Sequence, residues 1–186
     1  TINHIFCWAA LAEQIDGTTY TDLTGRFPIM SLENNQYIIV AYDYTTNAII
    51  VRAITDRESS TIVKAFDDIF TYLASKVFHS QFNVLDNEAS HAITQYLRQK
   101  NIKWQFVPPN EHRVNAAERA IQTFKNHLIA GLCSTDRDFS SQLWDKLLPQ
   151  VEIMLNLLRQ SNTTPMVSAY AHLSGPFNYN KMLLAP

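Results

Sequence analysis

Residues 37–55 hold the sequence pattern that most constrains the fold. Two apolar runs, YIIVAYDY at 37–44 and AIIVRAIT at 48–55, are separated by only three residues. Runs rich in Val, Ile and Tyr on either side of so short a connection predict the two strands of a β-hairpin. A Thr- and Tyr-rich run at 17–24, GTTYTDLT, predicts another strand before them. The first part of the chain is therefore expected to form a three-strand meander.

Helical patterns dominate the chain after this meander. Apolar residues recur at the spacing of one helix face over 59–78. Two short strand-like runs follow at 82–85 and 102–107, with a helical segment at 90–99 between them. Strands joined by helical crossovers pair in parallel. We therefore expect an α/β domain with a mixed five-stranded sheet, three meander strands plus two crossover strands, and helices on both faces.

Further helices are expected after the fifth strand. A long helix covers 115–132, a second covers 139–158 with Pro149 as a kink or break, and a short one follows Pro165. In open sheets with helical crossovers, functional groups gather beyond the strand ends. The strand ends are therefore the first place to look for a site.

The size and composition fit one intracellular domain. The chain has 186 residues, of which 46% are hydrophobic and 17% charged, which is ordinary globular composition. Its two cysteines form neither a metal-ligand spacing nor a disulfide framework, which favours a reducing compartment. No stretch has the length and apolarity of a membrane span. We expect an extension or linker at 1–16, the folded core at 17–175 and a C-terminal extension at 176–186.

The charge is distributed unevenly along the chain. The formal net charge is −2. Between Arg98 and His127, however, six Lys and Arg residues are opposed only by Glu111 and Glu118, so this segment carries +4 and the remainder −6. Such a basic segment on an acidic body fits a phosphate-facing surface, and a solvated helix face is the alternative.

Three carboxylates differ from the others in their position. Asp22 lies inside a strand pattern, where Asp is uncommon, and Asp86 follows the apolar run 82–85 directly. Glu118 lies in the first turns of the long helix. A turn would explain Asp86 and the helix dipole would explain Glu118, but neither explains all three residues. Three carboxylates at one strand-end site would repel one another unless a cation were bound there.

These candidate ligands predict a site for Mg²⁺ or Mn²⁺, the ions that prefer hard oxygen ligands. Two such ions can clamp the attacking and leaving oxygens of an in-line phosphoryl displacement. At about 100° per residue, Asn115, Glu118, Gln122 and Lys125 line one edge of the apolar face of the long helix. A nucleic-acid strand bound at the metal would therefore pass Lys125, and Arg119 is a further candidate for phosphate contact.

Several segments resemble one known family. YTDLTGRFP at 20–28, NVLDNEAS at 83–90 and VNAAERAIQTFKNH at 114–127 are similar to motifs in the catalytic core of retroviral and retrotransposon integrases, closest to the copia-type retrotransposon proteins. The hairpin at 37–54 and the later segments LWDKLLPQVEIMLNLLR and TTPMVSAYAHLSG match as well, so the resemblance covers nearly the whole chain. The fold that it implies is ribonuclease H-like, in agreement with the mixed sheet expected above.

The resemblance implies an enzyme of the Asp-Asp-Glu type. Carried over by motif, its metal-binding triad falls on Asp22, Asp86 and Glu118, and a position that contacts the donor DNA end falls on Lys125. Asp43 matches a strand position without a catalytic role. The implied activity is divalent-metal-dependent polynucleotidyl transfer, in which element DNA 3′ ends are trimmed and then joined to target DNA. The implied location is the nucleus, reached from a cytoplasmic particle.

The chain departs from the family pattern at three places. Thirty-one residues separate Asp86 from Glu118, fewer than is usual, while Glu88 and Asn115 stand where the family typically has Gly. Two alternatives therefore remain open. One is a core that keeps dimer assembly and DNA contact without catalysis. The other is a ribonuclease H-type nuclease, for which Glu88 is the only nearby candidate as a fourth carboxylate.

The helix expected at 139–158 has more apolar residues than one core-facing side requires. It is either wholly buried or part of a symmetric dimer contact together with the helix at 59–78. In the second case Trp144 or a neighbouring Leu is expected near the centre of the contact. The expected partners are thus element DNA ends, target DNA and further copies of the chain.

Overall fold

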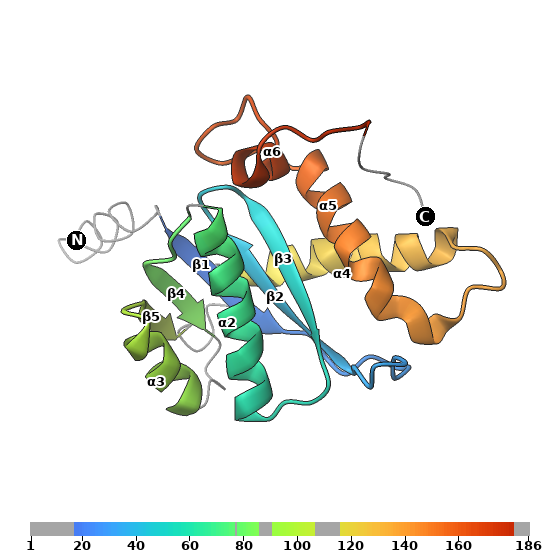
Figure 1. Ribbon diagram of the computed structural model, residues 1–186, viewed down its shortest axis with the longest axis horizontal. Helices are drawn as coiled ribbons and strands as arrows, with labels where there is room; N and C mark the ends of the chain where they lie inside the picture. The colour runs from blue at the N-terminus through green and yellow to red at the C-terminus, as the bar shows by residue number, and fades with distance from the viewer. Residues whose placement is uncertain (1–16, 77, 86–90, 107–115, 181–186) are drawn as a thin grey trace, which may run out of the picture.

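A five-stranded mixed sheet forms the centre of the molecule (Figure 1). The computed structural model describes residues 17–76, 78–85, 91–106 and 116–180. The strands are β1 (Thr18–Leu23), β2 (Tyr37–Asp43), β3 (Ala48–Ile54), β4 (Phe82–Leu85) and β5 (Lys103–Phe106), and their order in the sheet is β3-β2-β1-β4-β5. β1, β2 and β3 pair antiparallel, whereas β4 pairs in parallel with both β1 and β5. The predicted meander and its two crossover strands are confirmed.

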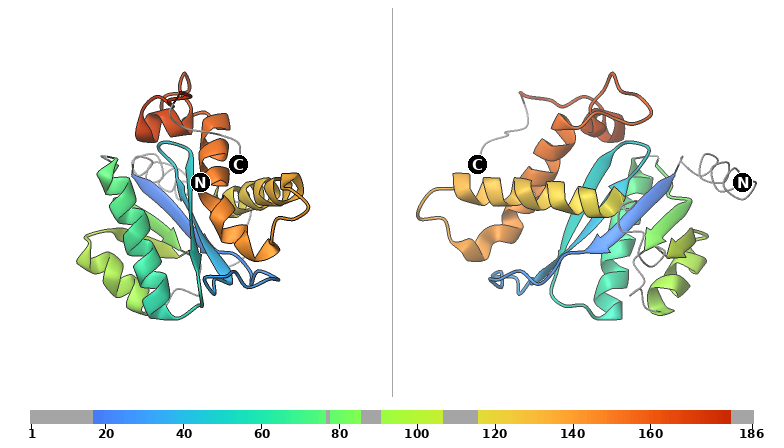
Figure 2. Two further views of the ribbon diagram at one scale, coloured as in Figure 1. Left: turned by 45° about the vertical axis from the view of Figure 1, so that its right-hand side comes forward. Right: turned by 180° about the vertical axis from the view of Figure 1, so that it is seen from behind.

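Helices pack on both faces of this sheet, as predicted. They are α2 (Ser59–Ser75), α3 (His91–Gln99), α4 (Ala116–Ser134), the 3₁₀ helix η2 (Ser141–Leu147), α5 (Leu148–Leu158) and α6 (Ala169–Ser174). Figure 2 shows α2 and α3 on one side of the sheet and α4 on the other. None of the helices in the described residues is long and apolar enough to cross a membrane.

The helix predicted at 139–158 is divided into two parts. η2 ends at Leu147 and α5 begins at the next residue, so Pro149 lies in the first turn of α5. A proline is tolerated there because the N–H that it lacks would have no helical partner. A short helix does follow Pro165, as predicted, but α6 begins only at Ala169, so Pro165 is not in its first turn. Ser168 caps the helix by accepting a hydrogen bond from the Ala171 N–H.

Two apolar clusters, one on each face, explain why the sequences of β2 and β3 are apolar at nearly every position. Ile39 and Ala41 of β2 belong to the cluster under α2 and α3, whereas the alternate residues Ile38 and Val40 belong to the cluster under α4 and α5. Successive side chains of a strand point to opposite faces. A strand covered on both faces therefore reads as a continuous apolar run.

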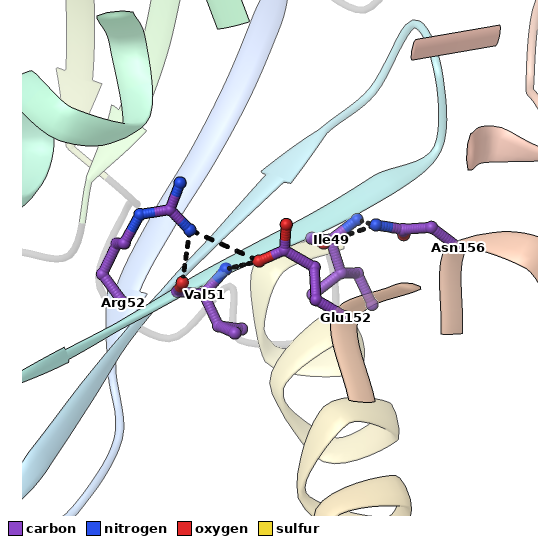
Figure 3. A network of polar contacts seen from close by, with 5 residues as sticks. All are labelled: Ile49, Val51, Arg52, Glu152 and Asn156. Carbon is purple, nitrogen blue, oxygen red and sulfur yellow. Dashed lines mark hydrogen bonds and ion pairs between the residues drawn. The ribbon is translucent and has the colours of Figure 1, made fainter. Parts of the chain in front are cut away.

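β3 is an edge strand, and side chains of α5 hydrogen-bond to its outer backbone (Figure 3). Asn156 Oδ1 accepts from the Ile49 N–H at 2.8 Å, and Asn156 Nδ2 donates to the Ile49 carbonyl at 2.8 Å. One turn earlier, Glu152 Oε2 accepts from the Val51 N–H at 2.9 Å. These bonds occupy backbone groups that an exposed edge would offer to another strand.

Candidate active site at the end of β1

Asp22 lies one residue before the end of β1, on the sheet face that α4 covers. In the sheet it pairs with Val40 of β2, which belongs to the apolar cluster under α4. Tyr20, two residues earlier in β1 and on the same face, packs against this cluster as well. Asp22 is partly exposed, and its Oδ1 accepts a hydrogen bond from the Leu23 N–H at 2.7 Å. This bond fixes the carboxylate at the point where the strand ends.

β4 leads toward the same edge of the sheet. It runs parallel to β1, and its last residue, Leu85, pairs with Thr21, the neighbour of Asp22. The register is fixed by a buried pair of side chains: Asn83 Nδ2 donates to Thr21 Oγ1 at 3.1 Å. Asp86 follows Leu85 directly but lies outside the described residues, so its predicted role as a ligand stays a prediction.

Glu118 lies in the first turn of α4 and is exposed to solvent. α4 packs against β1 and β2, and Figure 2 shows its start lying over β1. Burial and the neighbouring Tyr44 and Tyr42 raise the pKa of the Tyr20 hydroxyl, and the nearby Arg119 guanidinium opposes this rise. The first turn of α4 is therefore beside β1, and Glu118 is on the same face of the sheet as Asp22.

The predicted DNA-contact residues of α4 are exposed as far as the structure describes them. Arg119, Gln122 and Lys125 all face solvent, and Gln122 Nε2 donates to Asn126 Oδ1 at 3.0 Å. Lys125 is seven positions after Glu118, which corresponds to about 10 Å along the helix. Asn115 lies outside the described residues. The buried face of the same helix consists of Ala120, Ile121, Phe124 and Leu128.

The oxygen chemistry of this region suits a hard divalent cation. Within the described residues, no three His, Cys, Asp or Glu side chains are grouped so that they could hold a metal ion. Asp86 is not one of these residues. Asp22 and Glu118 supply carboxylates on one face of the sheet, and both have solvent access. Carboxylate ligands with room for water are the coordination that Mg²⁺ prefers.

Asp43, which was left out of the predicted site, has a structural role. It is buried at the end of β2, where its Oδ2 accepts from the Thr46 N–H at 2.8 Å and from Thr46 Oγ1 at 2.6 Å. These two bonds hold the tight turn between β2 and β3, and Asn47 in the same turn has a φ of 62°. The turn was predicted, but Asp43 as the residue that closes it was not.

The loop that follows β1 is held in place by Trp144, a role that sequence reasoning missed. The Trp144 ring stacks on Phe27 with centroids 4.2 Å apart, and its Nε1 donates to the Ile29 carbonyl at 2.9 Å. Trp144 is 0% exposed. It therefore cannot be at the centre of a dimer contact, so the part of the prediction that named Trp144 was wrong, and the part that named a neighbouring Leu stays a prediction. Its burial anchors the chain segment that leaves the candidate site.

The comparisons with known proteins identify structural relatives only. No family model and no curated protein sequence matches the chain. The catalytic core of BIV integrase matches with a TM-score of 0.62 at 14% identity, over 85% of this chain and 93% of that chain. The HTLV-2 integrase catalytic core in complex with magnesium, in a trimeric form, gives 0.62 at 16% identity, over 84% of this chain and 95% of that chain.

A larger assembly shows the same likeness. A chain of the simian T-cell lymphotropic virus intasome, in complex with PP2A regulatory subunit B56 gamma, gives a TM-score of 0.67 at 14% identity. The match covers 88% of this chain and 56% of that one. At these identities the agreement concerns the backbone arrangement. The chain has the ribonuclease H-like fold of retroviral integrase catalytic cores.

Proposed function

We propose that this chain is the catalytic core of a copia-type retrotransposon integrase, a polynucleotidyl transferase that processes element DNA 3′ ends and joins them to target DNA. One observation carries the proposal. In an integrase-core fold, Asp22 is at the end of β1 on the face covered by α4, and α4 carries Glu118 in its first turn. β4 ends beside Asp22, and Asp86 is the next residue.

In this proposal Asp22, Asp86 and Glu118 hold Mg²⁺ or Mn²⁺. When bound, such ions neutralise phosphate charge and keep the attacking and leaving oxygens of a displacement in line. The hydrogen bond between the Leu23 N–H and Asp22 Oδ1 restricts the rotation of that carboxylate and so orients it before any ligand arrives. Repulsion between the three carboxylates makes the unloaded site favourable for a cation.

The reaction consists of two displacements at phosphorus. In the first, water attacks a phosphodiester near the element end, and the broken P–O bond leaves the element strand with a free 3′ hydroxyl. In the second, this 3′ oxygen attacks a target phosphodiester, forms a new P–O bond and releases a target 3′ hydroxyl. No covalent intermediate with the enzyme is required.

DNA lies along the exposed edge of α4 in this proposal. Lys125 and Arg119 contact phosphate, and Gln122 and Asn115 complete the contact along the helix. Lys125 and Arg119 are both exposed to solvent. An overall net charge of −2 does not oppose this placement, because the residues between Arg98 and His127 carry +4.

The chain acts as a dimer or a higher oligomer in this proposal, in the nucleus. Met154 and Leu158, one turn apart on α5, are 39% and 71% exposed. Two large apolar side chains on one helix edge are the kind of surface that a second copy covers. They replace Trp144 as the residues that we expect at the contact.

A strand-transfer assay tests the function. The full-length parent protein is incubated with a labelled element-end duplex and target DNA in Mg²⁺ or Mn²⁺. We expect joined products from the wild type and from the control Asp138→Asn, which changes an exposed carboxylate far along the chain, and none from Asp22→Asn. DNA binding without products from the wild type would favour a non-catalytic core, and cleavage confined to an RNA–DNA hybrid would favour a nuclease.

A further inference from the structure

A pocket of about 470 Å³ lies where η2 and α5 meet the edge strand β3. Val51, Ala53, Leu148 and Pro149 form its apolar wall. The volume is within the range of small-ligand sites in proteins. β3 is two strands away from β1 in the sheet, so the pocket is separate from the candidate active site.

The polar wall of the pocket has more negative than positive charge. Glu33 forms an ion pair with Lys146, and Glu152 forms one with Arg52 at 3.4 Å. Asp145 also lines the pocket, and no Lys, Arg or His of the described residues lies within ion-pair distance of it. Lys146 is close enough to Asp145 for their charges to interact, so one ammonium is shared between Glu33 and Asp145. With Arg52 and Lys146 counted against the three carboxylates, the group has a net charge of −1.

Asp145 is also incompletely hydrogen-bonded. Its residue is 8% exposed, and its Oδ2 accepts from Asn35 Nδ2 at 2.9 Å. Its Oδ1 is buried and accepts no hydrogen bond. A buried acceptor without a donor destabilises the fold, and a charged one does so more strongly. The torsion that turns a carboxylate about its own axis is broad, so the Asp145 carboxylate can reorient when a donor enters the pocket.

These features favour an organic cation over other ligands. The walls combine an aliphatic surface with a carboxylate, which matches an alkyl stem that ends in an ammonium or guanidinium group. No three acidic or metal-ligating side chains in the described part of the chain are grouped to hold a metal ion, so Glu33, Asp145 and Glu152 do not form such a group. A net negative pocket repels nucleic acid.

We propose that this pocket binds the ammonium or guanidinium end of a lysine, an arginine or a free alkylamine, with Asp145 as the anchoring carboxylate. The alkyl stem lies against Val51, Ala53 and Leu148, and the charged end donates to Asp145. The site is independent of the proposed nucleic-acid chemistry, and an enzyme inactivated at Asp22 keeps it.

Amide NMR spectra of the chain titrated with small cations test the proposal. The probes are agmatine, the peptide Gly-Gly-Lys-Gly-Gly, the uncharged peptide with norleucine in place of lysine, and MgCl₂ at matched ionic strength. We expect the amides of Val51, Ala53 and Leu148 to shift with agmatine and with the lysine peptide. Tighter binding of the peptide would identify a polypeptide as the source of the cation, and tighter binding of agmatine a free amine.

The variant Asp145→Asn keeps the shape of the side chain and removes its charge. We expect it to weaken binding of both cations by about tenfold or more, because a charge-assisted hydrogen bond is lost. Asp138→Asn, an exposed carboxylate outside the pocket, should bind as the wild type does. If Asp145→Asn does not fold, the wild-type titrations alone decide the question.

Several results would overturn the proposal. Equal shifts with the norleucine peptide would show a merely apolar pocket, and the same shifts with MgCl₂ would show a metal site. No shift at a probe concentration on the order of 10 mM, where even very weak binding is visible, would show that nothing of this class binds. Shifts of the same amides with protein concentration alone, together with a dimer in sedimentation, would assign the pocket to a second copy of the chain.

Discussion

The end of β1 and the outer edge of β3 use polar side chains in opposite ways. At the β1 end, Glu118 and Lys125 project into solvent from α4. At the β3 edge, Asn156 is buried and Glu152 nearly so, and both hydrogen-bond to backbone groups of β3. Polar groups at the β3 edge therefore stabilise the fold, whereas those at the β1 end add little to it and remain accessible to a ligand.

This difference predicts that substitutions in the two regions separate activity from stability. The largest effect is expected for Asp22→Asn and Glu118→Gln. Each removes a proposed metal ligand, so strand transfer should fall by at least about 100-fold, as it does when a group that stabilises a transition state is lost. Loss of a carboxylate from a group of like charges should leave the free energy of unfolding unchanged or slightly higher.

Strand-transfer rates and urea unfolding, measured on the same samples, check this expectation. Asp138→Asn is the matched control, since it removes an exposed carboxylate outside the site. Near-normal turnover in either Asp22→Asn or Glu118→Gln would remove that residue from the proposed site. Destabilisation that parallels the loss of activity would make the β1 end a structural region like the β3 edge.

The second prediction concerns Asn156→Ala. It leaves both the N–H and the carbonyl of Ile49 without their side-chain partner in a buried position. We expect the free energy of unfolding to fall by about 2–4 kcal/mol, since each buried group that is left unsatisfied costs about 1–3 kcal/mol. Equilibrium urea unfolding measures this loss, and Asn126→Ala, an exposed asparagine on α4, should change stability by only about 0.5 kcal/mol or less.

The sheet and its layers were predictable because they depend on local patterns. The apolar runs on either side of Thr45–Asn47 were sufficient for the hairpin, and the helical spacing across 59–75 was sufficient for α2. The position of Asp22 in a strand and of Glu118 at a helix start was visible for the same reason. What these residues do together depends on Asp86, which lies outside the described residues.

The β3 edge was not predictable from local patterns. Asn156 reaches a strand that is 107 positions earlier in the sequence, and nothing near either residue indicates the pairing. Trp144 is similar, since its partners Phe27 and Ile29 belong to a loop more than 100 positions away. The apolar residues that flank Trp144 in the sequence suggested a contact with a second copy of the chain. In the structure Trp144 contacts Phe27 and Ile29 of its own chain instead.

A third prediction sharpens the account of the α4 surface. Lys125→Ala should weaken DNA binding severalfold and reduce the salt dependence by about one charge, because one phosphate contact is lost. Binding titrations at several salt concentrations measure this slope. Lys64→Ala is the control, because Lys64 is exposed on α2, on the opposite face of the sheet. An equal slope for Lys125→Ala and the wild type would make α4 a solvated face.

The smallest expected effect is a pH dependence at the β3 edge. Burial raises the pKa of the Glu152 carboxyl above its ordinary value of 4.5, although the Val51 N–H and the Arg52 guanidinium act in the opposite direction. A raised folded-state pKa means that the folded protein binds the proton more tightly than the unfolded one. Ionisation of the Glu152 carboxyl therefore lowers the free energy of unfolding as the pH rises from 4.5 through the folded-state pKa of this group.

Glu152→Gln removes this contribution, because the amide does not titrate. Urea unfolding at a series of pH values should show the wild type gaining stability relative to Glu152→Gln as the pH falls from neutral toward 4.5. A difference between the two proteins that does not vary with pH would mean that the carboxyl is not shifted by burial.

Manganese-induced line broadening tests the central claim most directly, since a bound Mn²⁺ ion broadens NMR signals of nearby nuclei. With Mn²⁺ added to the chain, we predict strong broadening of the Leu23 and Arg119 amides, and a much sharper signal from Ser134 at the far end of α4, about 24 Å along the helix from Glu118. Asp22→Asn should abolish the effect at Leu23. Equal broadening at Ser134, or the same broadening in Asp22→Asn, would contradict the proposal that Asp22 and Glu118 belong to one metal site.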